Sequence, residues 1–201
     1  MVVFGGTFDP IHRGHLHAAG HVSHSLGDVV VTMMVAPSPQ LRHPPEASLQ
    51  DRWKMLTLAC ESDLALKPSR FEDRHNGPTR TVQTLRDLAK TNDLPIVWAI
   101  GMDAFRNVSK WYQSKELPQV ASFFVLSRTV RQPTEMPTGF CSVQEPSQLL
   151  SNPGGVFVST EPMLNISATE IRRRIRGGLD VSDWLHPEVS KHIIKNHLYR
   201  G

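Results

Sequence analysis

The sequence predicts an α/β fold in which helices cover both faces of a mostly parallel sheet. Short apolar segments alternate with helical segments along the chain, which is the order that builds such a sheet. Residues 29–35 form a continuous, valine-rich apolar run, as is typical of a parallel strand buried on both faces. The first apolar segment leads directly into a glycine-rich turn and then a helical pattern, and ligands of parallel sheets bind at such turns.

The first part of the chain is expected to hold two strands and two helices. Residues 2–4 are a short apolar strand, and residues 15–26 have a helical pattern that ends at Gly27. The valine-rich strand 29–35 follows and leads into a proline-rich loop. Residues 48–62 then predict a helix with a broad apolar face.

The middle of the chain repeats this alternation. Residues 64–67 are a weak strand, and residues 81–90 carry apolar side chains in helical register. A third apolar run, 95–100, predicts a strand that ends at Gly101. Residues 103–111 are expected to form the next helix.

The last part of the chain begins with an apolar strand at residues 123–126. Residues 127–151 are polar and proline-rich without clear periodicity, so we expect the most mobile region there. A short strand at 156–159 follows. Two helices are expected after it, one at 168–176 that stops at a glycine pair and one at 187–198.

Length and composition favour one globular domain that acts on small molecules. The chain has 201 residues and a net charge of +3. We expect a single domain over residues 1–201, as a monomer or homodimer, with a C-terminal helical part of about 166–201 packed on it. The small positive charge suits anionic small molecules and gives little support for nucleic-acid binding, so no nucleic-acid partner is expected.

The sequence shows no sign of a membrane or metal-binding protein. No apolar run approaches the ~20 residues of a membrane helix, and no signal-peptide pattern is present, so a cytoplasmic location is expected. Cys60 and Cys141 are far apart and form no Cys-x-x-Cys pair, so neither zinc nor redox chemistry is indicated. We expect no metal ligands from the protein itself.

The segment 5–15, GGTFDPIHRGH, combines a glycine turn, a hydroxyl group and two histidines in a loop that opens onto a helix. Glycines let the backbone approach a ligand, and the free N–H groups of a helix N-terminus favour phosphate. His12 and His15 are three residues apart, so both can face the same phosphates. A plain turn with two surface histidines is disfavoured, because all these parts follow a strand together. We therefore predict a nucleotide site that acts on a phosphoryl group.

The segment 164–172, LNISATEIR, is the second motif. Ser167 is a natural helix N-cap, and Glu170 three residues later completes a capping box, with which many helices begin. The functional interpretation adds that Ser167, Thr169 and the free N–H groups form an anion cradle. Arg172 lies one turn further along the same helix and could reach the same phosphates.

Three further features are candidates for ligand contacts. Asp103 follows a strand, where a carboxylate commonly accepts hydrogen bonds from ribose, although an N-cap role is an equal alternative. Trp111 and Tyr112 are adjacent, so one of the two rings could stack on a ligand. In the segment 77–85, GPTRTVQTL, Thr79 or Thr81 could cap a helix whose exposed N–H groups could hold a carboxylate.

Both motifs resemble the signatures of the nucleotidyltransferase superfamily that carries the His-x-Gly-His motif, the second being Ile-Ser-x-Thr-x-Ile-Arg. Class I aminoacyl-tRNA synthetases carry a related first motif, but their lysine-rich second motif is absent here. The whole chain resembles the bacterial nicotinate-nucleotide adenylyltransferases, through GPTRTVQTL, IGMDAF, the Trp-Tyr pair and the C-terminal tail. This resemblance implies a Rossmann-like nucleotidyltransferase fold.

The resemblance also implies an activity and a set of site residues. The activity joins ATP and nicotinate mononucleotide into nicotinate adenine dinucleotide (deamido-NAD), releases pyrophosphate and serves NAD biosynthesis, with Mg²⁺ accompanying ATP. Candidate catalytic residues are His12, His15, Thr7 and Arg172. Candidates for ATP binding are Gly5, Gly6, Phe8, Gly101, Asp103, Ile166, Ser167 and Thr169. Candidates for mononucleotide binding are His43, Thr81, Trp111, Tyr112 and Arg128.

In this family Trp111 would stack on the pyridine ring, and backbone N–H groups near Thr81 and Tyr112 would hold the nicotinate carboxylate. The chain departs from the family at three places. The usual Ser-Tyr-Thr is Thr79-Arg80-Thr81 here. The Pro-Pro-His-Lys/Arg loop is Leu41-Arg42-His43-Pro44, with the basic residue displaced to position 42, and Arg-Pro-Gly is Ser127-Arg128-Thr129.

Two alternatives from different classes remain at this stage. The first is an adenylyltransferase for another acceptor, either nicotinamide mononucleotide or phosphopantetheine, although phosphopantetheine enzymes are shorter and lack this tail. The second is a non-catalytic nucleotide sensor with the same fold. Retention of both histidines and Arg172 argues against the sensor, because binding alone does not need groups that act in the transition state.

Overall fold

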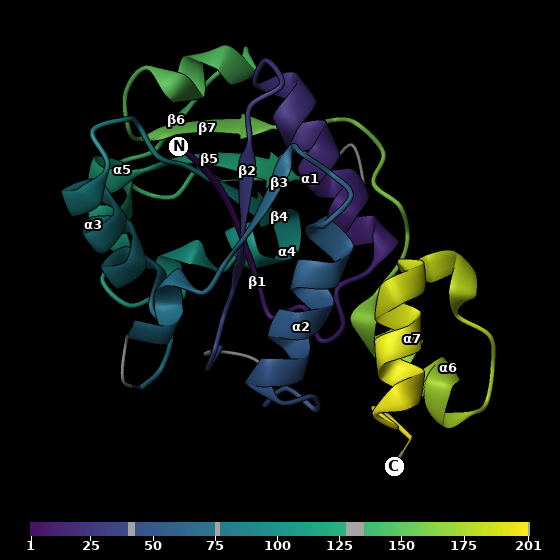
Figure 1. Ribbon diagram of the computed structural model, residues 1–201. Helices are drawn as coiled ribbons and strands as arrows, with labels where there is room; N and C mark the ends of the chain where they lie inside the picture. The colour runs from purple at the N-terminus through teal and green to yellow at the C-terminus, as the bar shows by residue number, and fades with distance from the viewer. Residues whose placement is uncertain (40–42, 75–76, 128–134, 201) are drawn as a thin grey trace.

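The computed structural model describes residues 1–39, 43–74, 77–127 and 135–200 (Figure 1). Its centre is a seven-stranded sheet in which every neighbouring pair of strands is parallel. In spatial order the strands are β3 (Leu66–Ser69), β2 (Val31–Val35), β1 (Val2–Gly6), β4 (Val97–Gly101), β5 (Ser122–Leu126), β7 (Gly155–Val158) and β6 (Cys141–Ser142). The predicted parallel α/β fold is confirmed.

The order of the strands reverses between β1 and β4, which is where a ligand crevice is expected in such a sheet. From β1 the chain moves to β2 and β3 on one side, and β4, β5 and β7 then continue on the other side. Where successive connections leave in opposite directions, the loops after the two central strands separate and open a ligand site at the carboxyl edge of the sheet. The loop after β1 is the glycine- and histidine-rich motif, and β4 ends at Gly101.

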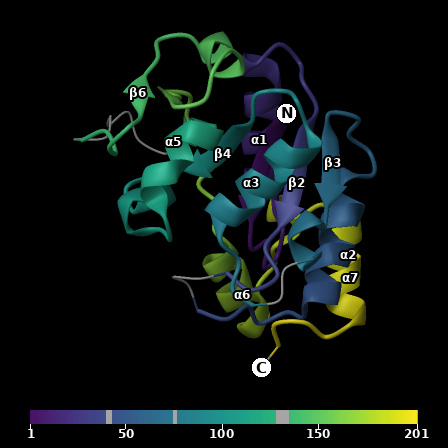
Figure 2. The ribbon, with the colours of Figure 1, turned by 90° about the vertical axis from the view of Figure 1, so that its left-hand side faces the viewer.

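Helices cover both faces of this sheet (Figures 1 and 2). One face carries α1 (Arg13–Ser25) and α2 (Leu49–Cys60), with α6 (Ala168–Arg176) and α7 (Pro187–Lys195) beyond them. The other face carries α3 (Thr81–Thr91), α4 (Met102–Phe105) and α5 (Leu117–Val120). Short 3₁₀ turns lie at Phe71–Arg74, Val108–Lys110, Ser114–Glu116, Pro146–Leu150 and Ser182–Trp184.

The sheet separates two hydrophobic cores. Val2 and Phe4 of β1 face the core shared with α1, α2 and α7, whereas Val3 faces the core shared with α3 and α4. This alternation follows from the two-residue period of side chains along a strand. Cys60 is buried in the first core, and burial raises the pKa of its thiol to about 12.

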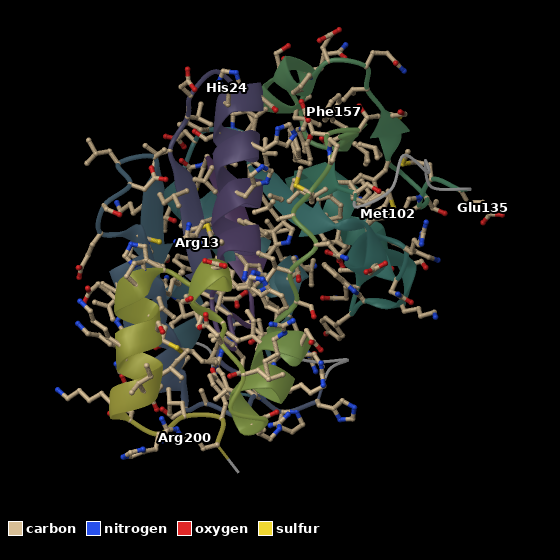
Figure 3. The ribbon with its side chains drawn as sticks, turned by 90° about the vertical axis from the view of Figure 1, so that its right-hand side faces the viewer. Arg13, His24, Met102, Glu135, Phe157 and Arg200 are labelled. Atoms are coloured by element: carbon tan, nitrogen blue, oxygen red, sulfur yellow. The ribbon has the colours of Figure 1, made fainter. Side chains whose placement is uncertain are left out.

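The C-terminal segment packs on the face that carries α1 and α2. Val189 and Ile193 of α7 belong to the first core. His192 Nε2 lies 3.0 Å from Asp51 Oδ1 of α2, and Arg13 Nε donates to the carbonyl of Leu185 at 3.1 Å. Figure 3 shows Arg13 at the start of α1, beside the C-terminal helices. Residues from the two ends of the chain therefore lie side by side.

The helix predicted at 103–111 is interrupted. α4 ends at Phe105, a 3₁₀ turn covers Val108–Lys110, and Trp111 has extended backbone angles. The side-chain amide of Asn107 donates to the carbonyl of Asp103 at 2.9 Å, a local bond that competes with the helical hydrogen-bond ladder. The stretch 127–151 also contains regular structure among its described residues, namely β6 and the turn Pro146–Leu150.

No helix in the described part of the chain is both long enough and apolar enough to cross a membrane.

Glu72 is a buried carboxyl group outside the loop of residues 5–15, which we call the phosphate loop. It lies in the turn Phe71–Arg74, is 3% exposed, and accepts a hydrogen bond from Thr84 Oγ1 of α3 at 2.6 Å. Burial raises the pKa of Glu72 from 4.5 to about 7, against the opposing effect of the Thr84 hydroxyl. The folded protein therefore holds this proton more tightly than the unfolded chain does.

This proton makes the stability of the fold depend on pH. Because the folded state binds the Glu72 proton more tightly, the free energy of unfolding falls as pH rises from 4.5 to about 7. Glu72→Gln should flatten this fall and stabilise the protein above pH 7 by up to about 3 kcal/mol. Urea unfolding across this pH range measures the free energy of unfolding of both proteins. Glu61→Gln, which changes an exposed glutamate, is the control. Equal slopes for wild type and Glu72→Gln would contradict the assignment.

Candidate functional site

The loop after β1 lies close against the sheet because two glycines end the strand. A Cβ atom added at Gly5 would lie 2.6 Å from Cζ2 of Trp98, and one added at Gly6 would lie 2.6 Å from Cε1 of Phe8. Phe8 is buried and has a positive φ of 49°, which turns the chain sharply. Side chains at positions 5 and 6 would therefore displace this loop from the carboxyl edge.

The two motif histidines lie side by side at the start of α1. His12 is the N-cap residue with extended backbone angles, and His15 follows in the first turn. Their rings stack with centroids 3.6 Å apart and 22° between the planes. The edge of the Phe8 ring supports His15, with a centroid distance of 5.1 Å. Both imidazoles are thus fixed where the free N–H groups of a helix favour an anion.

Gly14 lies between the two histidines, at a position where a side chain would crowd its neighbours. A Cβ atom at position 14 would lie 3.0 Å from Nδ1 of His12 and 3.4 Å from Cβ of Ile166. The glycine therefore allows the second motif to approach the first, and it leaves room for the His12 ring. The two motifs, separated by about 150 residues in the sequence, are brought together as the sequence predicts.

The second motif forms the N-terminus of α6. Ser167 is the N-cap residue, and its hydroxyl accepts from the backbone N–H of Glu170 at 3.3 Å. The reciprocal half of the predicted capping box is not formed, because the Glu170 carboxylate binds Arg173 and Arg174 instead. Thr169 is exposed in the first turn of this helix.

Arg172 binds two groups near the first motif. Its Nη1 donates to the carbonyl of Asp9 at 2.7 Å, and its Nε donates to Glu46 Oε1 at 2.8 Å. The other oxygen of Glu46 accepts from Arg176 at 2.7 Å. Burial acts to raise the pKa of Glu46, but the two guanidinium groups outweigh burial and hold it below its ordinary value. A carboxylate thus lies between two arginines beside the phosphate loop.

Asp9 connects the phosphate loop to the segment before α2 and to the C-terminal tail. Its carboxylate accepts from the backbone N–H groups of Glu46 and Ala47, at 2.8 and 3.1 Å, and from the Tyr199 hydroxyl at 2.7 Å. Asp9 is 5% exposed. Burial and the neighbouring Asp9 carboxylate raise the pKa of Tyr199, which keeps this hydroxyl a donor.

Arg52 holds the loops after β1 and β2 together. This side chain is 1% exposed and donates to the carbonyls of Thr7 and Ala36, both at 2.8 Å, and of Pro37 at 3.0 Å. Burial lowers the pKa of its guanidinium. Sequence reasoning did not assign this role. An arginine among the apolar residues of the helix predicted at 48–62 was the available indication.

The N-terminus of α3 lies next to the loop after β2. The backbone N–H of Thr79 donates to the carbonyl of Ser38 at 2.9 Å, and the Thr79 hydroxyl accepts from the N–H of Ser38 at 3.2 Å. The predicted cap by Thr79 or Thr81 is wrong, because the N-cap residue is Arg80 and no side chain caps the helix. Figure 2 shows α3 on the face opposite α2 and α7.

The aromatic pair lies beyond α4 on the same face. Trp111 is half-buried against the second core, whereas Tyr112 is 45% exposed. The guanidinium of Arg80 lies over the Tyr112 ring, 4.0 Å from its centroid. The two neighbouring rings thus have different surroundings, since Trp111 packs against the second core and Tyr112 against Arg80.

The remaining predicted site residues lie at the carboxyl edge or outside the described part. Gly101 is the N-cap of α4, so the alternative of Asp103 as the cap is wrong. Gly101 and Asp103 are both exposed at the end of β4, and His43 is exposed in the loop before α2. Arg128 lies outside the described residues.

The described residues include no group of three or more His, Cys, Asp or Glu side chains that could hold a metal ion. Besides the carboxylates of Asp9 and Glu46, the polar groups around the phosphate loop include imidazoles, guanidinium groups and backbone N–H groups. These are donors, which suit an anion. The Asp9 carboxylate already accepts three hydrogen bonds, and the Glu46 carboxylate is paired with Arg172 and Arg176.

Comparison with known proteins places the chain in a family. Residues 3–174 match the family model described as cytidylyltransferase-like, which includes both motifs. A curated relative from Yersinia pestis, named a probable nicotinate-nucleotide adenylyltransferase, is 33% identical and aligns over 99% of this chain and 94% of its own length. The chain belongs to the nicotinate-nucleotide adenylyltransferases of the cytidylyltransferase-like family.

A second curated relative and a solved structure are also similar to this chain. A relative from Pectobacterium atrosepticum with the same name is 34% identical over 98% of this chain and 97% of its own. A solved nicotinic acid mononucleotide adenylyltransferase from Plasmodium falciparum, in complex with NaAD, has a TM-score of 0.74. It is 17% identical and covers 98% of this chain and 96% of its own, which supports the fold.

Proposed function

We propose that this chain is a nicotinate-nucleotide adenylyltransferase that joins ATP and nicotinate mononucleotide into nicotinate adenine dinucleotide and pyrophosphate, in NAD biosynthesis. The observation that carries the proposal is the packing of the second motif on the first, which places an arginine-bearing helix N-terminus beside two stacked imidazoles. The names of the relatives agree with this activity.

The reaction needs positioning and charge neutralisation more than proton transfer. An oxygen of the mononucleotide 5′-phosphate attacks the α-phosphorus of ATP. The bond from that phosphorus to the bridging oxygen breaks, and pyrophosphate leaves with the electron pair. Because the attacking phosphate is already an anion, no general base is required, and the barrier is lowered by alignment and by donors aimed at the phosphoryl oxygens.

We assign the first motif to the centre of this reaction. His12 and His15 donate to the α-phosphate and the bridging oxygen, where negative charge increases in the transition state. Thr7 and the backbone of Gly5 and Gly6 line the phosphate path. Close packing at Gly5 and Gly6 and the hydrogen bond from Arg52 to the Thr7 carbonyl hold this loop in place.

We assign the second motif to the leaving group. Ser167, Thr169 and the N–H groups of α6 hold the β- and γ-phosphates, and Arg172 joins them. The Glu46 carboxylate accepts a hydrogen bond from Arg172 Nε. When ATP binds, its phosphate oxygens replace this carboxylate at the guanidinium. Phe8 and Ile166 contact the nucleotide beside the phosphates, and Gly101 and Asp103 contact the adenosine ribose at the end of β4.

We assign the mononucleotide to the side of the crevice under α3. Trp111 stacks on the pyridine ring, and the N–H groups of Thr81 and Tyr112 hold the nicotinate carboxylate. The absence of a side-chain cap on α3, within the described residues, leaves its first N–H groups for such an acceptor. His43 and Arg128 complete the mononucleotide site.

Mg²⁺ enters this reaction with ATP. The donor set around the loop fits a phosphate, and the small hard cation prefers phosphate oxygens and its own waters. When bound, the ion neutralises charge on the triphosphate. We further propose that residues 1–201 act as one nucleotidyltransferase domain, with 166–201 packed on it, as a monomer or homodimer in the cytoplasm.

Pyrophosphate release tests the proposed function. Purified protein is mixed with ATP, Mg²⁺ and one acceptor, either nicotinate mononucleotide, nicotinamide mononucleotide or phosphopantetheine. The expected result is the fastest release with nicotinate mononucleotide and formation of the dinucleotide. ATP binding without release from any acceptor would support the sensor, and fastest release with another acceptor would support that enzyme.

A further inference from the structure

The positively charged guanidinium of Arg80 lies beside the proposed nicotinate site. It is the last residue before α3, so it directly precedes Thr81, the first residue of the helix. Its guanidinium carbon lies 4.0 Å from the centroid of the Tyr112 ring. The cation therefore lies between the two backbone segments to which the carboxylate contacts are assigned.

The aromatic segment is fixed against α3 by a second arginine. Arg86 of α3 forms an ion pair with Glu116 and donates to Gln113 Oε1 at 3.2 Å. These contacts anchor the chain on the far side of Tyr112 to the same helix that begins at Arg80. The distance between the helix N-terminus and the aromatic pair is thus set by the fold.

Arg80 differs from the other arginines that stack on rings in the described part of the chain. Arg74 lies over Phe71, Arg70 over Trp53 and Arg174 over Trp184. Each of these three also donates to an oxygen: Arg74 to the Phe71 carbonyl, Arg70 to Asp73, and Arg174 to Glu170. Arg80 makes no side-chain hydrogen bond or ion pair with a described residue, and its Nε is shielded from solvent.

Such an arrangement is costly unless an acceptor arrives. A buried donor without a partner costs about 1–3 kcal/mol, and a guanidinium fork matches a carboxylate in geometry and charge. Stacking on Tyr112 holds the plane of the guanidinium without using its N–H groups. The N–H groups of Arg80 thus remain for an anionic ligand.

We propose that Arg80 is a specificity-determining residue that pairs with the carboxylate of bound nicotinate, so that this chain selects the acid over the amide partly by charge. This inference rests on the proposed function. The backbone N–H groups at Thr81 and Tyr112 can donate to an acid or to an amide oxygen. A cation distinguishes the two, because a hydrogen bond to an ionised acceptor is about twice as strong as a neutral one.

The test compares both mononucleotides with wild type, Arg80→Gln and Arg80→Lys. In Arg80→Gln the ratio of kcat/KM for nicotinate over nicotinamide mononucleotide should fall about tenfold, through a higher KM for the acid, with kcat changed less than about twofold. Arg80→Lys should keep part of the preference. High salt should lower the ratio in wild type and have little effect in Arg80→Gln.

The control is Arg74→Gln, which removes a stacked arginine from the same region and should leave the ratio unchanged. A parallel fall for both substrates in Arg80→Gln would show a merely structural role and overturn the inference, as would an unchanged ratio. Titration of each mononucleotide by tryptophan fluorescence provides a readout independent of turnover. Failure of wild type to release pyrophosphate would refute the proposed function, whereas an active wild type with Arg80 variants that keep the wild-type ratio would refute this inference alone.

Discussion

His15→Ala is expected to lower kcat about 10²–10³-fold and to leave the fold intact. The imidazole lies in the first turn of α1, stacked 3.6 Å from the His12 ring, where we assign it a donor role toward the α-phosphate. Removing a donor that acts mainly in the transition state lowers kcat more than it raises KM. Steady-state pyrophosphate release measures the loss.

The matched control is His17→Ala, which removes an exposed histidine two residues further along the same helix. It should keep wild-type turnover, and both variants should melt within a few degrees of wild type. Near-normal turnover in His15→Ala would refute its assignment. Equal losses in the two variants would point to a general effect on α1.

Arg52→Met should have the largest effect on stability. The substitution keeps the apolar stem in the core but leaves the carbonyls of Thr7, Ala36 and Pro37 without their buried donor. Breaking a buried charged network in this way costs about 3–5 kcal/mol of the free energy of unfolding. Urea unfolding followed by circular dichroism measures the change.

Arg52→Met should also raise the KM for ATP, because the loops after β1 and β2 lose their common anchor. Lys54→Met, on the exposed side of the same helix, is the control and should change the free energy of unfolding by less than about 0.5 kcal/mol. A loss in Arg52→Met no greater than in this control would show that water or other groups replace the guanidinium.

The sequence was informative wherever structure is determined by neighbouring residues. Valine-rich runs predicted the parallel strands, and the two motifs predicted the loop after β1 and the start of α6, since glycine turns and N-caps act over a few positions. The broken helix near Asn107 shows the limit of this reasoning. The hydrogen bond from the Asn107 side chain to the Asp103 carbonyl competes with the backbone hydrogen bonds of the helix predicted over 103–111.

Contacts between distant segments could not be predicted in the same way. Nothing near Glu46 indicates that its carboxylate lies between Arg172 and Arg176, because those partners follow more than 120 residues later. The stacking of Arg80 on Tyr112 likewise depends on how α3 meets the segment after α4. Arg52 was the partial exception, since a charge among apolar helix residues indicates a buried partner.

The hydrogen bond from Tyr199 to Asp9 affects when, during synthesis, the contacts of the phosphate loop can be completed. The two residues are 190 positions apart, and the Asp9 carboxylate accepts all three of its hydrogen bonds only when both the tyrosine and the Glu46–Ala47 backbone are in place. During synthesis Asp9 is translated 190 positions before Tyr199, one of the residues that support it. The hydrogen bonds that hold the Asp9 carboxylate can therefore be completed only after position 199 has been translated.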